Sequence, residues 1–94
     1  MDLQKIIEWA GRDYNSDFSD FFDWIKRVLV DKDYAIDYGF YDEFLDKSYY
    51  VECYIGRRGT NLYARGTGKN KEDAFCNALI ELINKTNKRW RLKH

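Results

Sequence analysis

Residues 34–65 read YAIDYGFYDEFLDKSYYVECYIGRRGTNLYAR, and this stretch decides the fold. Apolar and aromatic side chains recur at every second position, the period at which side chains alternate between the two faces of a strand. The strands predicted from this alternation cover residues 34–41, 49–55 and 60–65. The polar connection at 42–48 and the turn at 56–59 are short, and glycines at 66 and 68 are expected to end the third strand. We therefore expect an antiparallel meander, since parallel strands would need longer crossover connections.

Segments with helical periodicity flank the strands on both sides. Apolar residues at intervals of three and four predict helices over 3–10, 17–31 and 71–84. Asp2 and Asn70 are placed as N-caps, and Gly11 as the end of the first helix. The order α-α-β-β-β-α predicts an α+β fold with its helices on one face of the sheet. No proline or linker interrupts the chain, so residues 1–94 are expected to form one domain with a basic tail at 88–94.

The inventory of reactive side chains argues against catalysis. The chain has two cysteines, Cys53 and Cys76, and a single histidine, His94, which is its last residue. A structural zinc site needs four nitrogen or sulfur ligands, so we expect no metal and no cofactor. Asp37 and Glu52 could suggest a metal-dependent nuclease, but the lysine that such sites place after the glutamate is absent. We therefore expect a protein that is not an enzyme.

The chain also lacks the signals of membrane proteins and of exported ones. No apolar run exceeds four residues, which excludes a membrane span. The amino terminus does not have the basic-then-apolar layout of a signal peptide. A cytoplasmic protein without a membrane partner is the expectation.

Charge is balanced over the whole chain and uneven along it. Residues 1–47 carry twelve acids and six bases, a net charge of −6, whereas residues 48–94 carry four acids and ten bases, a net charge of +6. An acidic surface attracts basic protein surfaces, and a basic surface attracts nucleic acid. Alternatively, the two halves neutralise each other in the folded domain.

Residues 66–79, GTGKNKEDAFCNAL, carry a family resemblance. They resemble the closing motif of double-stranded-RNA-binding domains, a family with the order α-β-β-β-α and a pattern close to G-x-G-x-S-K-K-x-A-K-x-x-A-A. The positions that keep the family's residues are Gly66, Gly68, Lys71, Ala74 and Ala78. Glu72 and Phe75 replace two of the three lysines that hold phosphates in the family. The resemblance therefore implies a shared architecture rather than RNA binding.

The composition, rich in Asp, Lys, Asn and Tyr and free of proline, resembles that of small phage proteins. This resemblance implies an inhibitor that binds a host protein, such as a CRISPR effector nuclease, through an acidic surface that imitates nucleic acid. The acids expected to form that surface lie on the second helix and after the first strand. They are Asp17, Asp20, Asp23, Asp42, Glu43 and Asp46, with Trp24 either buried or a neighbouring anchor.

The alternative is a protein that binds double-stranded RNA or single-stranded nucleic acid through its basic half. The residues expected to contact phosphates are Arg57, Arg58, Arg65, Lys69, Lys71, Arg89 and Arg91. Tyr50, Tyr54 and Tyr63 are expected on the sheet face opposite the helices, where they could stack on bases or simply cover a small sheet. The identity of the partner and the oligomeric state are left open by the sequence.

Overall fold

The computed structural model describes residues 3–12, 17–43 and 48–86. Its elements are α1 (Leu3–Ala10), α2 (Phe18–Asp31), β1 (Tyr34–Glu43), β2 (Ser48–Arg57), β3 (Tyr63–Gly68) and α3 (Lys71–Lys85). The predicted order and the α+β class are confirmed. The expected tail at 88–94 lies outside the described residues. Among the helices described, none is long and apolar enough to cross a membrane.

The ends of the helices follow from local chemistry. Gly11, at φ 71°, ends α1 and its N–H donates to the carbonyl of Ile7 at 3.0 Å. Asp17 caps α2 by accepting the N–H of Asp20 at 3.1 Å. Asn70 caps α3 in the same way, accepting from the N–H of Asp73 at 2.9 Å. The predicted caps at Gly11 and Asn70 are thus confirmed, whereas Asp2 lies outside the described residues.

The sheet has the order β1-β2-β3 with antiparallel pairing throughout. The third strand was expected at 60–65 and instead runs from Tyr63 to Gly68. Thr60 explains the shift, because its N–H and hydroxyl both donate to the carbonyl of Arg57 and its hydroxyl accepts from the N–H of Leu62. These bonds hold residues 58–62 in the turn. Gly66 therefore lies within the strand, whereas Gly68 is its last residue, as expected.

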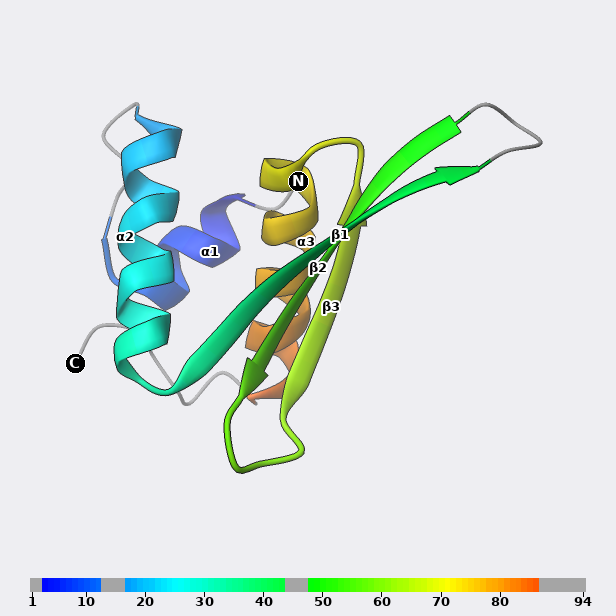
Figure 1. The fold of residues 1–94 in the computed structure, drawn as a ribbon. Coiled ribbons are helices and arrows are strands. Elements are labelled where there is room, and N and C mark those ends of the chain that lie inside the picture. The colour runs from blue at the N-terminus through cyan, green and yellow to red at the C-terminus, as the bar shows by residue number, and fades with distance from the viewer. Residues whose placement is uncertain (1–2, 13–16, 44–47, 87–94) are drawn as a thin grey trace.

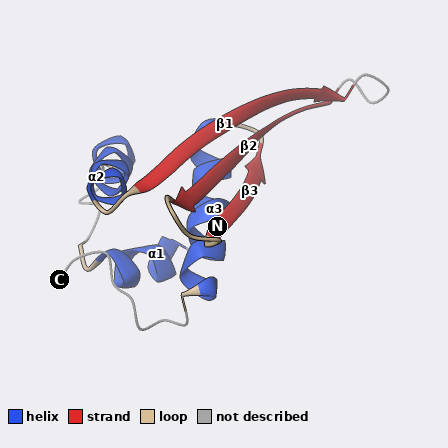
Figure 2. Cartoon of the chain, turned by 60° about the horizontal axis from the view of Figure 1, so that its bottom comes forward, coloured by secondary structure: helices blue, strands red, loops and turns tan. Residues whose placement is uncertain are grey.

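The helices pack on one side of the sheet, and the core lies between the two layers (Figures 1 and 2). α3 lies against β3 and β2, and α2 lies beside β1. The inward-facing residues of β2, Val51, Cys53 and Ile55, are buried. Phe22 of α2 meets the ring of Phe75 of α3 edge to face, with the ring centroids 5.7 Å apart. Aromatic packing of this kind joins the two long helices.

Glycine permits the close approach of α3 to β3. A Cβ atom on Gly66 would lie 2.1 Å from the amide nitrogen of Ala78 and 2.5 Å from the carbonyl oxygen of Ala74. Neither backbone atom belongs to a flexible side chain that could move aside. The glycines and alanines of the 66–79 motif therefore form the contact between helix and strand, which is the architectural role that the resemblance implies.

β1 and β2 are longer than the rest of the sheet. Each has ten residues, whereas β3 has six, and the last pair between β2 and β3 joins Val51 to Gly68. Beyond this pair β1 and β2 continue as a two-stranded ribbon that projects away from the helices (Figure 1).

Candidate functional site

Four tyrosines lie on the face of the sheet that the helices leave uncovered. Alternation along the paired strands places Tyr41 of β1, Tyr50 and Tyr54 of β2 and Tyr63 of β3 on this side, opposite to buried Cys53. Tyr41 stacks on Tyr50 with the ring centroids 5.1 Å apart, and Tyr54 stacks on Tyr63 at 6.5 Å. We call these four residues the tyrosine face. The positions of Tyr50, Tyr54 and Tyr63 agree with the sequence-based expectation, and Tyr41 is an addition.

Gly39 explains how the first of these stacked pairs forms. The ring of Tyr41 lies over Gly39, since a Cβ atom there would be 2.7 Å from Cε2 and 2.8 Å from the hydroxyl oxygen of Tyr41. The missing side chain leaves room for the ring to lie along the strand. Tyr41 is nevertheless 42% exposed, and Tyr63 is 52% exposed. The tyrosine face therefore presents aromatic surface to the solvent.

A charged pair occupies the centre of the tyrosine face. Glu52 of β2 is 4% exposed, and its carboxylate accepts hydrogen bonds from the guanidinium of Arg65 and from the hydroxyl of Tyr54. The pKa of the Tyr54 phenol is raised, first by loss of hydration and then by the neighbouring phenols of Tyr41, Tyr63 and Tyr50. Glu52 thereby links β2 to β3 and fixes the Tyr54 ring. The sequence suggests Glu52 only as a metal ligand, because its pairing with Arg65 depends on the register of β2 and β3.

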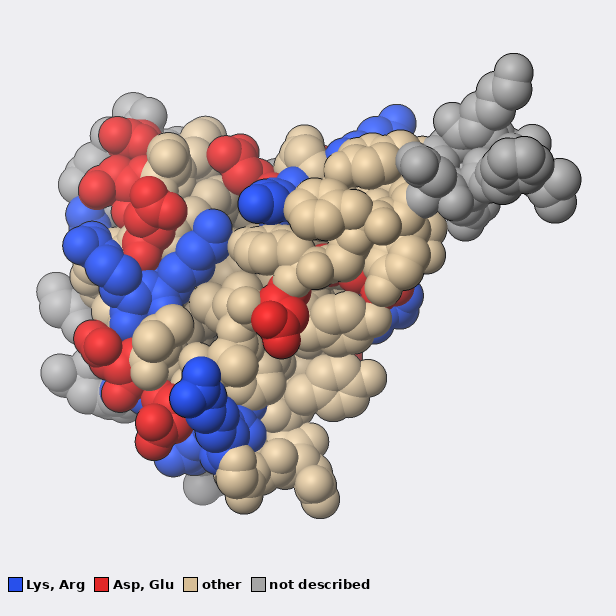
Figure 3. Space-filling model, in the orientation of Figure 1, with Lys and Arg blue, Asp and Glu red and all other residues tan. Residues whose placement is uncertain are grey.

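The tyrosine face is poor in net charge. By the same alternation Asp37, Glu52 and Arg65 lie on this side of the sheet, which gives two carboxylates and one guanidinium among the side chains that the structure describes. Figure 3 shows the complementary picture over the helical side of the molecule, where acidic and basic side chains are interleaved, while much of the surface over the strands is uncharged. Acidic and basic side chains are thus mixed on the part of this view that the helices form (Figure 3).

The acids of the expected protein-binding surface have different surroundings. Asp17 is the N-cap of α2, Asp20 forms an ion pair with Arg12 at 3.2 Å, and Asp23 is exposed. Asp42 and Glu43 belong to β1, but their side chains, like the whole of Asp46, lie outside the described part of the chain. The start of α2 and the far end of the β1–β2 ribbon are on opposite sides of the molecule (Figures 1 and 2). The fold therefore does not bring the two groups of acids together.

Trp24, expected from the sequence either to be buried or to act as an anchor, is partly buried against the core. The guanidinium of Arg12 lies over its indole ring, 4.9 Å from the centroid. Since Arg12 also pairs with Asp20, this arginine covers both an expected anchor and an expected acid.

The basic residues of the nucleic-acid alternative are also dispersed. Arg57 and Arg58 lie at the turn before β3, and Lys69 follows its end, so the length of β3 (roughly 17 Å for six residues) separates them. Arg65 is neutralised by Glu52, and Lys71 lies over the rings of Tyr38 and Phe40 on the helical side of β1. Arg89 and Arg91 lie outside the described residues.

The two cysteines are buried in the core as free thiols. Burial raises the pKa of Cys53 to about 12 and that of Cys76 to about 11, so both are protonated at neutral pH. In the part of the chain that the structure describes, no three Cys, His, Asp or Glu residues gather as metal ligands would. The described residues thus present neither a thiolate nucleophile nor a ligand cluster.

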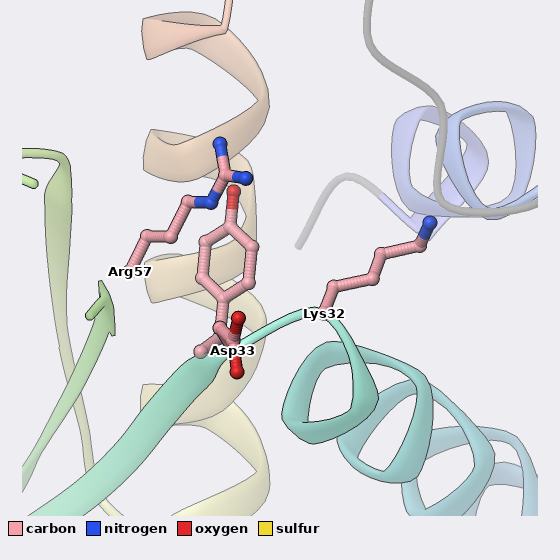
Figure 4. Close-up of a pocket in the computed structure, with 4 residues that line it drawn as sticks. Lys32, Asp33 and Arg57 are labelled. Atoms are coloured by element: carbon pink, nitrogen blue, oxygen red, sulfur yellow. The ribbon is translucent and has the colours of Figure 1, made fainter. Parts of the chain in front are cut away.

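A small pocket lies at the junction of α2 and β1, lined by Lys32, Asp33, Tyr34 and Arg57 (Figure 4). Its volume is about 220 Å³, below the roughly 300–1,000 Å³ of typical ligand pockets. Asp33 adopts φ 70° there, and its carbonyl accepts the N–H of Arg58 at 2.9 Å. The Lys32 side chain extends away from Asp33 and Arg57 (Figure 4). This geometry describes a structural joint rather than a ligand site.

Comparison with known proteins adds no functional information. No protein-family model, no curated protein and no solved structure matches the chain. The order α-α-β-β-β-α is consistent with the architecture of double-stranded-RNA-binding domains, which have one helix before the three strands and one after them. At the family's lysine positions, Phe75 is buried in the core and Glu72 is exposed. The element order is therefore consistent with that family, while the family's phosphate-binding lysines are replaced at these two positions.

Proposed function

We propose that this chain is a non-enzymatic binding module that captures a protein partner on its tyrosine face. The observation that carries the proposal is the pair of stacked tyrosine contacts, Tyr41 on Tyr50 and Tyr54 on Tyr63, on a sheet face without helical cover. Tyrosine is enriched in protein interfaces and in their hot spots, because it combines a large apolar ring with a hydroxyl group at low cost in conformational entropy. Strand pairing and the Glu52 contacts hold the rings in place before binding.

The charge of this surface favours a protein over a nucleic acid. A groove that holds nucleic acid neutralises phosphates with lysine and arginine. Among the described side chains, this side of the sheet instead has two carboxylates and one guanidinium, and that guanidinium is already paired with Glu52. Bases could stack on the rings, but their phosphates would meet little positive potential there. A partner with apolar groups and hydrogen-bonding groups fits this surface better.

The more specific expectations drawn from the sequence remain predictions. They are inhibition of a host effector nuclease through an acidic surface, and nucleic-acid binding through the basic half. The paired state of Asp20 and the distance between the two groups of acids weaken support for the acidic surface. We therefore assign the contact to the tyrosine face and keep a host protein as the expected class of partner.

Affinity capture with matched variants tests the proposal. The test bait carries Tyr50→Ala and Tyr63→Ala, and the control bait carries Tyr49→Ala. Tyr49 is exposed to 48%, close to the 52% of Tyr63, but it points to the opposite side of the ribbon. A partner recovered by the wild type and by the control, and lost by the double variant, supports the proposal. Equal recovery by all three baits refutes it, as does the absence of any specific partner.

Filter binding tests the alternative that the chain binds nucleic acid instead of a protein. Labelled RNA and DNA, double-stranded and single-stranded, are titrated over a salt series. We expect no binding stronger than about 100 μM at physiological salt, the weak end of non-specific association. Micromolar binding with a steep dependence on salt, abolished by the Tyr50 and Tyr63 substitutions, would show that the tyrosine face binds nucleic acid instead of a protein.

A further inference from the structure

The two edges of the sheet differ in how their backbone groups are bonded. Side chains of α3 cover the edge of β3. Asn77 donates to the carbonyl of Thr67 at 2.6 Å, Lys85 donates to the carbonyl of Tyr63 at 2.5 Å, and Glu81 accepts the N–H of Arg65 at 3.3 Å. Such cover is one way in which proteins prevent another strand from pairing with an edge.

The opposite edge, along β1, has no such cover over residues 35–41. The N–H of Arg58 donates to Asp33, which shows that odd-numbered β1 residues bond to β2. The N–H and C=O groups of Ile36, Tyr38 and Phe40 therefore point outward. No described residue donates to or accepts from these outward groups. This edge is also free of proline, so every outward position has a donor.

Two lysines flank this edge on its helical side. The Lys26 ammonium lies 5.7 Å from the ring centroid of Tyr38, and the Lys71 ammonium lies 5.3 Å from the same ring. Lys71 is also 5.6 Å from the centroid of Phe40, which is 54% exposed. Among the described residues neither lysine has an ion-pair partner within 4.0 Å. The side chains of Tyr38 and Phe40 thus end beneath two cations, and no described carboxylate holds either cation in an ion pair.

We propose that the edge of β1 docks an extended acidic segment of a protein partner as an added fourth strand. The backbone of that segment bonds to the outward groups of Ile36, Tyr38 and Phe40. Its side chains on the helical side, two residues apart, place carboxylates against Lys26 and Lys71. The two unpaired cations determine the choice of occupant, because a second copy of this chain paired along the same edge would bring four lysines together. This contact is separate from the tyrosine face and goes beyond the function proposed above.

A synthetic peptide provides the probe. We would titrate a capped peptide of alternating threonine and glutamate, about seven residues long, into labelled protein and follow the amide resonances by NMR. We expect shifts at Ile36, Tyr38 and Phe40 and slower hydrogen exchange at their amides, while the amides on the α3-covered edge of β3 stay unchanged. The counterpart with lysine in place of glutamate should bind at least fivefold more weakly. Lys26→Gln combined with Lys71→Gln should abolish most of that difference.

A matched pair of substitutions at Phe40 tests the role of the backbone. Phe40→Pro removes an N–H that points to solvent, which an edge strand tolerates, whereas Phe40→Ala removes the ring and keeps the N–H. We expect the proline variant to bind the glutamate peptide at least threefold more weakly than the alanine variant. If the proline variant does not fold, the exchange measurement on the unmodified chain decides the question. The combined Tyr50→Ala and Tyr63→Ala variant should bind the peptide normally, so failure of the tyrosine face and failure of this edge are distinguishable.

Several results would overturn the proposal. They are the absence of shifts at the three β1 amides with about 5 mM glutamate peptide, equal binding of the lysine peptide, and equal binding by the two Phe40 variants. Protection of the same amides that grows with protein concentration in the absence of peptide would assign the edge to a second copy of the chain instead.

Discussion

The contact of α3 with β3 at Gly66 supports the whole arrangement, and Gly66→Ala tests it. The new Cβ atom would lie 2.1 Å from the amide nitrogen of Ala78, where ordinary contact begins near 3.4 Å. The helix would have to move by roughly 1.3 Å, which would disturb the Asn77 and Glu81 bonds to the β3 edge. Overpacking of this kind costs about 3 kcal/mol. For a chain of this size that loss lowers the melting temperature by about 15 °C.

Gly56→Ala is the matched control. A Cβ atom on Gly56 meets its nearest neighbour, Cβ of Tyr63, at 3.5 Å, which is ordinary van der Waals contact. This variant should unfold within about 1 kcal/mol of the wild type, because less chain entropy is lost on folding and no clash arises. Both variants are measured by urea denaturation followed by circular dichroism. Equal stability of Gly66→Ala and Gly56→Ala would refute the reasoning about the helix contact.

Three further predictions concern stability. Arg65→Ala leaves the nearly buried carboxylate of Glu52 with a phenol as its remaining donor and should lower the free energy of unfolding by about 2 kcal/mol; a urea midpoint equal to that of the wild type would contradict this. Asp33→Gly relieves the strain of the φ of 70° at the end of α2. It should raise the free energy of unfolding by about 0.5 kcal/mol and the melting temperature with it. A lower melting temperature would contradict this prediction and would show that the carboxylate has an essential contact. Folding raises the pKa of the Cys53 and Cys76 thiols from an ordinary value of 9.0 to about 12 and about 11, so their contribution to stability is complete below pH 9 and is lost as the pH rises toward 11–12; stability that is constant or increases between pH 9 and 11 would contradict this assignment.

Much of the fold could be predicted because each element has a strong local signal. The period of two over 34–41 and the capping residue Asn70 are sufficient to place β1 and the start of α3. The predicted bounds of the third strand were wrong because the hydrogen bonds of Thr60 and the helix packing of Gly66 depend on tertiary context. A glycine pattern by itself does not distinguish a strand end from a strand under close helical contact.

The candidate site was harder to predict for a related reason. Alternation gives the face on which Tyr50, Tyr54 and Tyr63 lie, but it does not give the partners across the strands. Stacking of Tyr41 on Tyr50 and the pairing of Glu52 with Arg65 depend on the register, which the strand lengths alone do not fix. Summing charge over each half of the chain likewise omits local pairing, such as that of Arg12 with Asp20.

The most direct test of the account compares dissociation constants for the purified partner, measured by calorimetry with Tyr63→Ala and with Tyr49→Ala. Loss of a hot-spot tyrosine costs about 2 kcal/mol, which is roughly a thirtyfold weaker dissociation constant. The account predicts this loss for Tyr63→Ala and a change of less than about threefold for Tyr49→Ala, because the second ring faces away from the tyrosine face. Equal dissociation constants for the two variants, or a larger loss for Tyr49→Ala, would contradict it.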